Sequence, residues 1–367
     1  MRFINKYLRN LAPYKVASHK VWEVDKAERK SMLKLDWNEA TIPPSPNVKK
    51  RLVKLAEQDD MFSLYPSTNN VELVNLLSSY CGVPAENIQY FASSDALHEY
   101  LVRMFVSVGD PILILGPTYD NFRLTCESQG AKIYYFEYST GFVLDERKFI
   151  DSIKHTNPSL IYICNPNNPS GNLVSKNFIE EILINFPNSL LLLDEAYYEF
   201  SGMTLANEVL KYDNLFISRT FSKAFALANF RAGYLISDSE NIKQISKIRN
   251  PKNFTTFTQE AVIGALEDVQ YMHDFVSEVK RSKEYFAHEL SSIPGVVHTY
   301  QSHGNFVLIE FESSEIKELI FKGLADNFIY VRNLTHNEML NNSLRITIGT
   351  QEQMKHVVNV IKSIVGE

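Results

Sequence analysis

Short apolar runs, spaced along residues 34–253, constrain the fold of this chain more than any other feature. Several are apolar throughout instead of alternating, which is typical of strands buried on both faces of a mostly parallel sheet. The runs are Ile88–Phe91, Pro111–Leu115, Lys132–Phe136, Leu160–Cys164, Leu190–Leu193, Asn214–Ser218 and Gly233–Ile236. Helical patterns separate some of them, at Asp95–Val108, Tyr119–Ser128 and Lys176–Asn185. This order predicts an α/β domain in which helices cover the sheet.

The last third of the chain has a different pattern. A long helical pattern extends from about Thr258 to about Ser291, and fewer, more mixed elements follow it. They are predicted strands at Phe306–Glu310, Ile329–Arg332 and Leu344–Ile348, a helix from Ser314 to Ala325, and a last helix that closes the chain. We therefore expect an N-terminal arm at 1–30 that packs with the small domain, a large domain at 31–260 and a small α+β domain at 261–367.

Composition excludes several classes of partner. The formal net charge of -6 leaves no basic surface of the kind that nucleic acid or an anionic membrane requires. No apolar run is long enough to span a bilayer, and the first residues lack the apolar stretch of a signal peptide. The three cysteines, Cys81, Cys126 and Cys164, are too far apart for a zinc spacing or a disulfide framework. We expect a cytoplasmic protein with reduced thiols, no metal, no nucleic acid and no membrane partner.

Four polar segments directly follow predicted strands. Open α/β sheets bind ligands at the carboxyl ends of their strands, so these segments are candidates for a common site. They are Ser93-Ser94-Asp95-Ala96, Asn165-Pro166-Asn167-Asn168-Pro169-Ser170-Gly171, Asp194-Glu195-Ala196-Tyr197, and the stretch from Ser218 to Tyr234 that contains Lys223.

Each segment also has an ordinary structural explanation. The helix start after Ser93 is either an anion site or a simple N-cap. The loop at 165–171 is either part of a site or only a rigid turn, and Asp194 is either a ligand group or an N-cap. Lys223 has small and apolar neighbours, and a lysine withdrawn from water loses proton affinity, which is the condition for Schiff-base chemistry. The usual alternative is a lysine that faces solvent.

Taken together and in this order, the segments resemble fold-type I pyridoxal-phosphate (PLP) enzymes, and within them the histidinol-phosphate aminotransferase family. The resemblance covers nearly the whole chain. It implies a large PLP-binding domain with a mostly parallel mixed sheet covered by helices, and a smaller α+β domain. The pieces that carry it are Arg9–Tyr14, Trp37-Asn38-Glu39, Leu64-Tyr65-Pro66, Pro117-Thr118-Tyr119, the run Ser222–Ala228 and the closing Leu344–Thr350.

The resemblance implies a role for each cofactor residue. Lys223 forms the Schiff base with PLP and moves the proton, while Asp194 pairs with the pyridine nitrogen so that the ring can accept electrons. Tyr197 and Asn168 hydrogen-bond the ring oxygen, and Tyr119 stacks on the ring. The phosphate is expected to contact the backbone amides of Ser94, Asp95 and Ala96 and the side chains of Ser222, Arg231 and Thr220.

The resemblance also implies a substrate site and a homodimer. Tyr65 resembles the tyrosine that reaches the cofactor phosphate from the neighbouring subunit, so each active site is expected to be complete only in a homodimer. Arg345 resembles the arginine that binds the substrate anion, because a guanidinium group takes a carboxylate or a phosphate with two parallel bonds. Arg332, Tyr14 and Asn38 are expected to help it bind the substrate. An ordinary surface arginine is the alternative for Arg332.

The expected activity is transfer of an amino group between glutamate or 2-oxoglutarate and a small phosphorylated carbonyl compound. Imidazole-acetol phosphate is the family's expected acceptor. A three-carbon phosphorylated ketone of the dihydroxyacetone-phosphate type, in sugar or capsule biosynthesis, is an alternative. The sequence departs from the family pattern at some positions, such as Asn229 where a glycine is common, and these departures leave both acceptors open.

Two further classes of function share the PLP fold. A PLP decarboxylase of a phosphorylated amino acid would share all the cofactor residues. A PLP-fold regulator without turnover is disfavoured by the intact Lys223, Asp194 and Tyr197. A metal hydrolase is excluded because His98-Glu99 lacks the second histidine that such zinc sites require.

Overall fold

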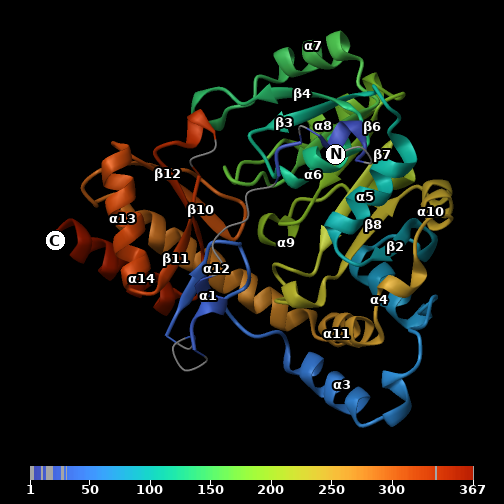
Figure 1. Ribbon diagram of the computed structural model, residues 1–367, viewed down its shortest axis with the longest axis horizontal. Helices are drawn as coiled ribbons and strands as arrows, with labels where there is room; N and C mark the ends of the chain where they lie inside the picture. Colours follow the sequence, from blue (N-terminus) through green and yellow to red (C-terminus); the bar gives the residue numbers. More distant parts are fainter. Residues whose placement is uncertain are drawn as a thin grey trace.

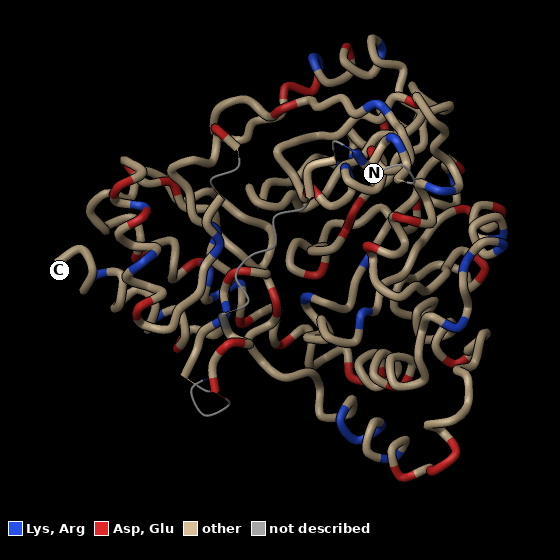
Figure 2. Tube along the Cα trace, in the orientation of Figure 1, with Lys and Arg blue, Asp and Glu red and all other residues tan. Residues whose placement is uncertain are grey.

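The computed structural model describes residues 4–9, 11–13, 20–25, 29, 31–334 and 337–366. The predicted substrate residue Tyr14 lies outside the described residues. Two domains lie side by side in Figure 1, one around a seven-stranded sheet and one around a five-stranded sheet. Figure 2 shows acidic and basic residues interspersed along the outer helices and loops. In the described part of the chain, no helix is both long and apolar enough to cross a membrane.

The larger sheet has the strand order β2-β8-β7-β6-β5-β3-β4. Neighbouring strands are parallel except around β8, which is antiparallel to both β2 and β7. The predicted strands are confirmed, with ends shifted by one or two residues at most. Their bounds are β2 Ile88–Phe91, β3 Pro111–Gly116, β4 Lys132–Glu137, β5 Leu160–Cys164, β6 Leu190–Asp194, β7 Leu215–Thr220 and β8 Gly233–Ser237.

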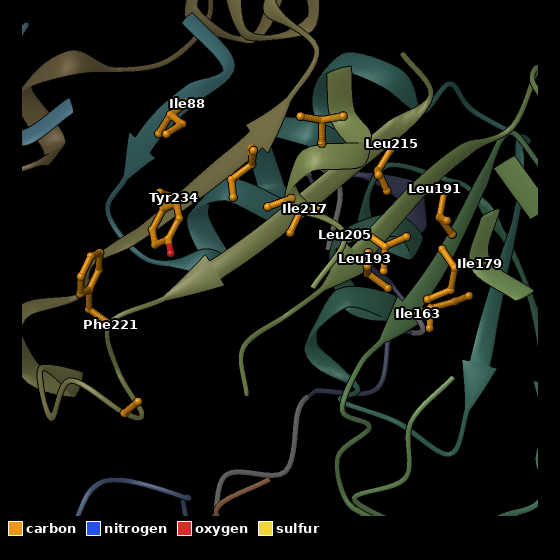
Figure 3. Close-up of a cluster of buried hydrophobic side chains, with 14 of the residues drawn as sticks. Ile88, Ile163, Ile179, Leu191, Leu193, Leu205, Leu215, Ile217, Phe221 and Tyr234 are labelled. Carbon is orange, nitrogen blue, oxygen red and sulfur yellow. The ribbon is translucent and has the colours of Figure 1, made fainter. Parts of the chain in front are cut away.

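The strands of this sheet are buried on both faces, which explains their continuous apolar runs. In β6, Leu191 and Leu193 belong to one core cluster, while Leu190 and Leu192 belong to another on the opposite face. Figure 3 shows the first cluster, in which Ile163, Leu193 and Ile217 from adjacent strands pack together. The helices of this domain are α3 Pro46–Ala56, α4 Val71–Cys81, α5 Ser94–Phe105, α6 Asn121–Ser128, α7 Glu146–Thr156, α8 Lys176–Asn185, α9 Tyr198–Ser201, α10 Ser239–Ser246 and α11 Thr256–Leu266.

The smaller sheet has the strand order β1-β11-β12-β10-β9. Its strands are β1 Leu33–Leu35, β9 Val296–Thr299, β10 Phe306–Phe311, β11 Ile329–Asn333 and β12 Ser343–Thr347. The helices α12 Val269–Leu290, α13 Ser314–Asp326 and α14 Gln351–Val365 pack with it around a separate core. Short elements complete the chain: α1 Lys20–Glu23, η1 Lys6–Leu8, η2 Asp59–Phe62, η3 Ala85–Asn87, η4 Thr140–Phe142, η5 Ala206–Leu210, η6 Ala228–Phe230, η7 Pro251–Asn253 and η8 Glu338–Leu340.

The structure differs from the predicted domain bounds near the N-terminus. Residues 33–35 were expected in the large domain, but β1 pairs in parallel with β11, and Leu35 is buried in the smaller core. The arm at 1–30 was expected to pack with the small domain; one short piece of it, η1, lies against α6 of the large domain, where Tyr7 covers Gly130. These contacts depend on residues far away in sequence, so local patterns do not reveal them.

The long helical pattern after residue 258 is also interrupted. It forms two helices, α11 and α12, which are separated at Glu267 and Asp268. Asp268 has a non-helical backbone conformation (φ -134°, ψ 54°) and precedes the first residue of α12. One helix therefore ends at Leu266 and the next begins at Val269, where the chain passes from the large domain to the small one.

Candidate active site

Lys223 lies in the segment that follows β7, at the carboxyl end of the larger sheet. Its Nζ donates a hydrogen bond to the backbone oxygen of Trp37 at 2.8 Å and lies 5.8 Å from the ring centre of Tyr197. Burial lowers the pKa of Lys223 to about 8, and the positive charge of Arg345 contributes to the shift. An appreciable fraction of this amine is therefore neutral near physiological pH, as a nucleophilic lysine requires.

Asp194 is the last residue of β6 and is buried. Its Oδ2 accepts a hydrogen bond from Tyr162 at 2.9 Å, and its Oδ1 accepts bonds from the Ser218 hydroxyl at 3.1 Å and the Ala196 amide at 3.2 Å. Three donors on different elements thus fix the orientation of this carboxylate. The alternative role as a helix N-cap does not apply, because Tyr197 holds that position at the start of α9.

The N-terminus of α5 forms one wall of an anion cradle. Ser93 caps the helix by accepting a hydrogen bond from the Ala96 amide at 3.1 Å, so this predicted phosphate donor is already in use. The amides of Ser94 and Asp95 have no acceptor within the described residues. Gly233 of β8 lies against this turn, and a Cβ added there would come within 2.5 Å of the Ser94 nitrogen. The close approach of strand and helix therefore requires glycine.

Polar side chains surround the same cradle. The Asp95 carboxylate accepts hydrogen bonds from Arg231 at 3.1 Å and from the Tyr119 hydroxyl at 3.1 Å. Thr220 and Ser222, both buried, are joined through hydroxyls 2.9 Å apart. The structure thus brings together Arg231, Tyr119 and the start of α5, and places the Thr220–Ser222 pair directly before Lys223. A helix N-terminus with a nearby guanidinium group is suited to a phosphate.

A second hydrogen-bonded group surrounds Tyr197. Its hydroxyl accepts bonds from Asn38 at 3.0 Å and from Asn168 at 3.4 Å. Burial raises the pKa of the Tyr197 phenol, and the positive charge of Arg345 opposes part of that shift. Asn38 is held in turn by the hydroxyl of Thr347 on β12. That hydroxyl accepts a hydrogen bond from the backbone amide of Asn38 and donates one to its side-chain oxygen.

Arg345 extends from the smaller sheet toward the large domain. Its Nη1 donates to Asn168 Oδ1 at 2.5 Å, and its Nη2 donates to the backbone oxygen of Asp36. Arg332 on β11 is its direct cross-strand partner in the register of β11 with β12. Like charges in directly opposed positions repel, and a bound anion relieves that repulsion.

Tyr65 lies on the surface of the described chain. Its side chain is 77% exposed, and Lys252 Nζ lies 4.3 Å from its ring centre.

Three contacts of the site were missed by sequence reasoning. Trp37 takes part through its backbone oxygen, which leaves no signal in the residue type. The sequence pattern shows Tyr162 only as part of a buried strand and Ser218 only as part of a longer run. Their roles depend on Asp194, which lies on a neighbouring strand in each case. A polar residue in an otherwise apolar strand was the one available signal.

These residues fit PLP. The cradle at α5 matches a phosphate, Asp194 matches a ring nitrogen, and Lys223 has the lowered pKa that an imine-forming amine needs. When bound, PLP supplies an electron-withdrawing ring that stabilises negative charge at a substrate carbon. Sequence and structural comparisons agree with this fit.

The fold and the site define a PLP-dependent transaminase of fold type I. The chain belongs to the aminotransferase class I and II family, whose model matches residues 30–361. It is 39% identical over 364 residues to a dihydroxyacetone phosphate transaminase of Campylobacter jejuni, which covers 98% of this chain and 96% of that protein. It is 33% identical over 337 residues to a histidinol-phosphate aminotransferase of Ruminiclostridium cellulolyticum, which covers 90% of this chain and 92% of that protein.

A solved structure shows the same fold. The histidinol-phosphate aminotransferase of Sinorhizobium meliloti in complex with pyridoxal-5'-phosphate superposes with a TM-score of 0.89 at 22% sequence identity. The superposition covers 100% of this chain and 98% of that one. The division into a larger and a smaller domain is therefore shared with an enzyme of known fold.

Proposed function

We propose that this enzyme transfers an amino group between glutamate or 2-oxoglutarate and a small phosphorylated ketone. The observation that carries this proposal is the cross-strand pair of Arg345 and Arg332. A phosphate dianion at neutral pH suits two guanidinium groups, whereas glutamate needs only Arg345, for one of its carboxylates. Arg345 then serves both half-reactions, and Arg332 acts mainly on the phosphorylated substrate.

The first candidate for the ketone is a three-carbon compound of the dihydroxyacetone-phosphate type. The relative named for that substrate is 39% identical to this chain over 98% of its length. Imidazole-acetol phosphate is the second candidate, supported by relatives named histidinol-phosphate aminotransferase at 33% identity. The two compounds share a phosphorylated ketone, so both suit the same pair of arginines.

Each residue of the site has a distinct task in this reaction. The Lys223 amine, with a pKa of about 8, takes a proton from the substrate carbon and returns it. Asp194 holds a proton on the ring nitrogen, and Tyr197 and Asn168 hydrogen-bond the ring oxygen. The cofactor phosphate is held by the backbone amides of Ser94 and Asp95 and by the side chains of Thr220, Ser222 and Arg231. Tyr119 covers the ring. Asn38 positions Tyr197 and contributes to the substrate site.

We also propose that the protein is a cytoplasmic homodimer with shared active sites. The segment after α3 exposes three large apolar side chains, Phe62 at 66%, Leu64 at 58% and Tyr65 at 77%. Adjacent exposed apolar residues of this kind favour burial against another surface. A second copy of this chain is the proposed occupant, with Tyr65 reaching the cofactor phosphate of the partner subunit.

A panel of amino acceptors tests the reaction. The purified enzyme, loaded with PLP, is incubated with glutamate and either dihydroxyacetone phosphate, imidazole-acetol phosphate or an unphosphorylated ketone. We expect 2-oxoglutarate to form with a phosphorylated ketone and much more slowly with the unphosphorylated one. Release of carbon dioxide from a phosphorylated amino acid, without any need for 2-oxoglutarate, would instead establish a decarboxylase.

A further inference from the structure

We propose that His98 is a positioning residue for the cofactor, acting on Asp194 through Ser218. His98 lies on α5, the helix whose first turn forms the anion cradle, and it is 2% exposed. Its Nε2 is 2.9 Å from the Ser218 hydroxyl oxygen, and that hydroxyl is 3.1 Å from Asp194 Oδ1. This inference rests on the proposed role of Asp194 at the ring nitrogen.

The direction of the hydrogen bonds follows from the groups themselves. An ionised carboxylate only accepts hydrogen bonds, so Ser218 must donate its single hydrogen to Asp194. The serine oxygen is then left as an acceptor toward His98. His98 therefore carries a hydrogen on Nε2 and donates it to Ser218. The result is a directed series of donors that ends on Asp194.

Packing around His98 holds its ring in place. The imidazole meets the ring of Phe122 edge-on at 5.6 Å and that of Tyr162 at 6.0 Å. Phe122 and Tyr162 stack on each other at 4.3 Å, and the hydroxyl of Tyr162 donates to the other oxygen of Asp194. The packed rings of His98, Phe122 and Tyr162 thus hold in place the hydrogen-bond donors to both oxygens of Asp194.

An apolar side chain would satisfy this packing at lower cost, because burying a polar ring is unfavourable unless it is hydrogen-bonded. The bond to Ser218 accounts for a histidine at this position. Hydrogen bonds in series strengthen one another, so a donor to the Ser218 oxygen makes its hydroxyl a better donor to Asp194. Without that donor, the Ser218 hydroxyl is a weaker and less firmly oriented donor to Asp194.

The test compares His98→Leu, which removes the donor, with His98→Gln, which keeps an N–H donor. Val102→Ala is the matched control, because Val102 is buried on the same helix but contacts neither Ser218 nor Asp194 by a hydrogen bond. The first measurement is the ¹⁵N chemical shift of the ring nitrogen in enzyme loaded with ¹⁵N-labelled PLP. The second, on cofactor-free protein, is the imidazole N–H signal of His98 in protein with ¹⁵N-labelled histidine.

We expect the wild-type ring nitrogen to be protonated and the His98→Leu shift to move toward neutral pyridine. The kcat should fall about tenfold, the effect of one lost hydrogen bond of roughly 1.4 kcal/mol, while the KM for glutamate stays within about twofold. His98→Gln should recover most of the shift and rate, and Val102→Ala should change neither. In the cofactor-free protein, Ser218→Ala should expose the His98 N–H to rapid exchange.

A wild-type shift and kcat in His98→Leu would overturn the proposal, as would a His98 N–H that is insensitive to Ser218→Ala. A failure of the proposed role of Asp194 can be told apart from a failure of the His98 proposal. If the wild-type ring nitrogen is neutral, or if Asp194→Asn leaves its shift unchanged, Asp194 does not hold the ring and the proposed role of His98 falls with it. The exchange measurement on cofactor-free protein then still reports whether the His98–Ser218 bond exists.

Discussion

Arg345 and Asn168 join the two domains, with Nη1 of the arginine 2.5 Å from the side-chain oxygen of the asparagine. Arg345 belongs to β12 of the smaller sheet, and Asn168 follows β5 of the larger one. Asn168 also donates to the Tyr197 hydroxyl at 3.4 Å. The proposed substrate arginine is therefore hydrogen-bonded to Asn168, one of the two residues proposed to hold the ring oxygen, and through it is linked to the other, Tyr197. An anion that binds Arg345 competes with Asn168 for the guanidinium group and so acts on both domains.

Replacement of Arg332 should separate the two half-reactions. Arg332→Ala removes one guanidinium group from the phosphate and none from glutamate, so kcat/KM for the phosphorylated substrate should fall at least about tenfold more than for glutamate. Single-turnover measurements of each half-reaction give the two values. Arg281→Ala, at an exposed position on α12, is the control. Equal losses in both half-reactions would mean that Arg332 only braces the domain.

Replacement of Asp194 should leave cofactor binding largely in place but slow the reaction. Asp194→Ala removes the partner of the ring nitrogen, and loss of such an electrostatic contact costs at least about a hundredfold in kcat. Cofactor content is read from absorbance, and kcat from 2-oxoglutarate formation. Asp151→Asn, on the exposed side of α7, is the control. Near-normal turnover of Asp194→Ala would refute its assignment.

The lowered pKa of Lys223 predicts a distinct pH dependence of its reactivity. In the folded, cofactor-free protein the pKa is about 8, so the neutral amine should reach half its maximum near pH 8 and fall about fiftyfold by pH 6. Competitive acetylation with peptide mass spectrometry measures this at Lys223 alone. The unfolded protein is the control, because there the same lysine titrates near its ordinary value of about 10.4. Reactivity in the folded protein that still rises steeply above pH 9 would contradict the lowered pKa.

Much of this architecture was predictable because burial on both faces of a sheet leaves a local signal. The runs at β5 and β6 are apolar without interruption, and the polar residues that follow them end in the site. The sequence of Leu33–Leu35 carries no such signal, because three alternating residues do not specify which sheet they join. Its place beside β11 depends on contacts made with residues about three hundred positions later.

The residues of the candidate site also fall into two groups, those that local sequence identifies and those that only the folded chain brings together. Lys223, Asp194 and Arg345 were identified because their neighbours in sequence resemble a family pattern. The bond from Lys223 to Trp37 spans 186 residues and uses a backbone oxygen that any residue possesses. The His98–Ser218–Asp194 series depends on a helix, a strand and a strand end that meet only in the folded chain. Such contacts follow from topology, which single-sequence patterns do not determine.

A buried ion pair behind the site should matter for stability. Arg219 and Glu195, each 1% exposed, lie 2.8 Å apart, and Thr204 also donates to Glu195 at 2.9 Å. Arg219→Leu leaves the Glu195 charge buried without its partner, so the free energy of unfolding should fall by roughly 3–5 kcal/mol. Denaturant unfolding of cofactor-free protein measures it. Removing the exposed cation Lys243 should have little effect, and an equally small effect for Arg219→Leu would show that the pair is unimportant.

Mixed dimers test whether Tyr65 acts across the subunit interface. Lys223→Ala should be inactive, and Tyr65→Ala should bind PLP more weakly. Light scattering should give a dimer for each. In a mixed dimer of the two variants, one site combines the native Lys223 of one subunit with the native Tyr65 of the other, so about one normal site per dimer should return. A mixed population with no recovered activity, or a fully active monomer, would argue against shared sites.

The most direct test of the whole account is to locate the lysine that bonds the cofactor. Borohydride reduction of the enzyme loaded with PLP fixes the cofactor to its lysine, and peptide mass spectrometry identifies the modified residue. We predict a single modified peptide that contains Lys223. Lys283, on α12 of the small domain, is a built-in comparison, because burial also lowers its pKa to about 8 and its Nζ, like that of Lys223, donates to a backbone oxygen, here that of Gly304. Modification at Lys283 or any other lysine, with Lys223 unmodified, would contradict the site described here.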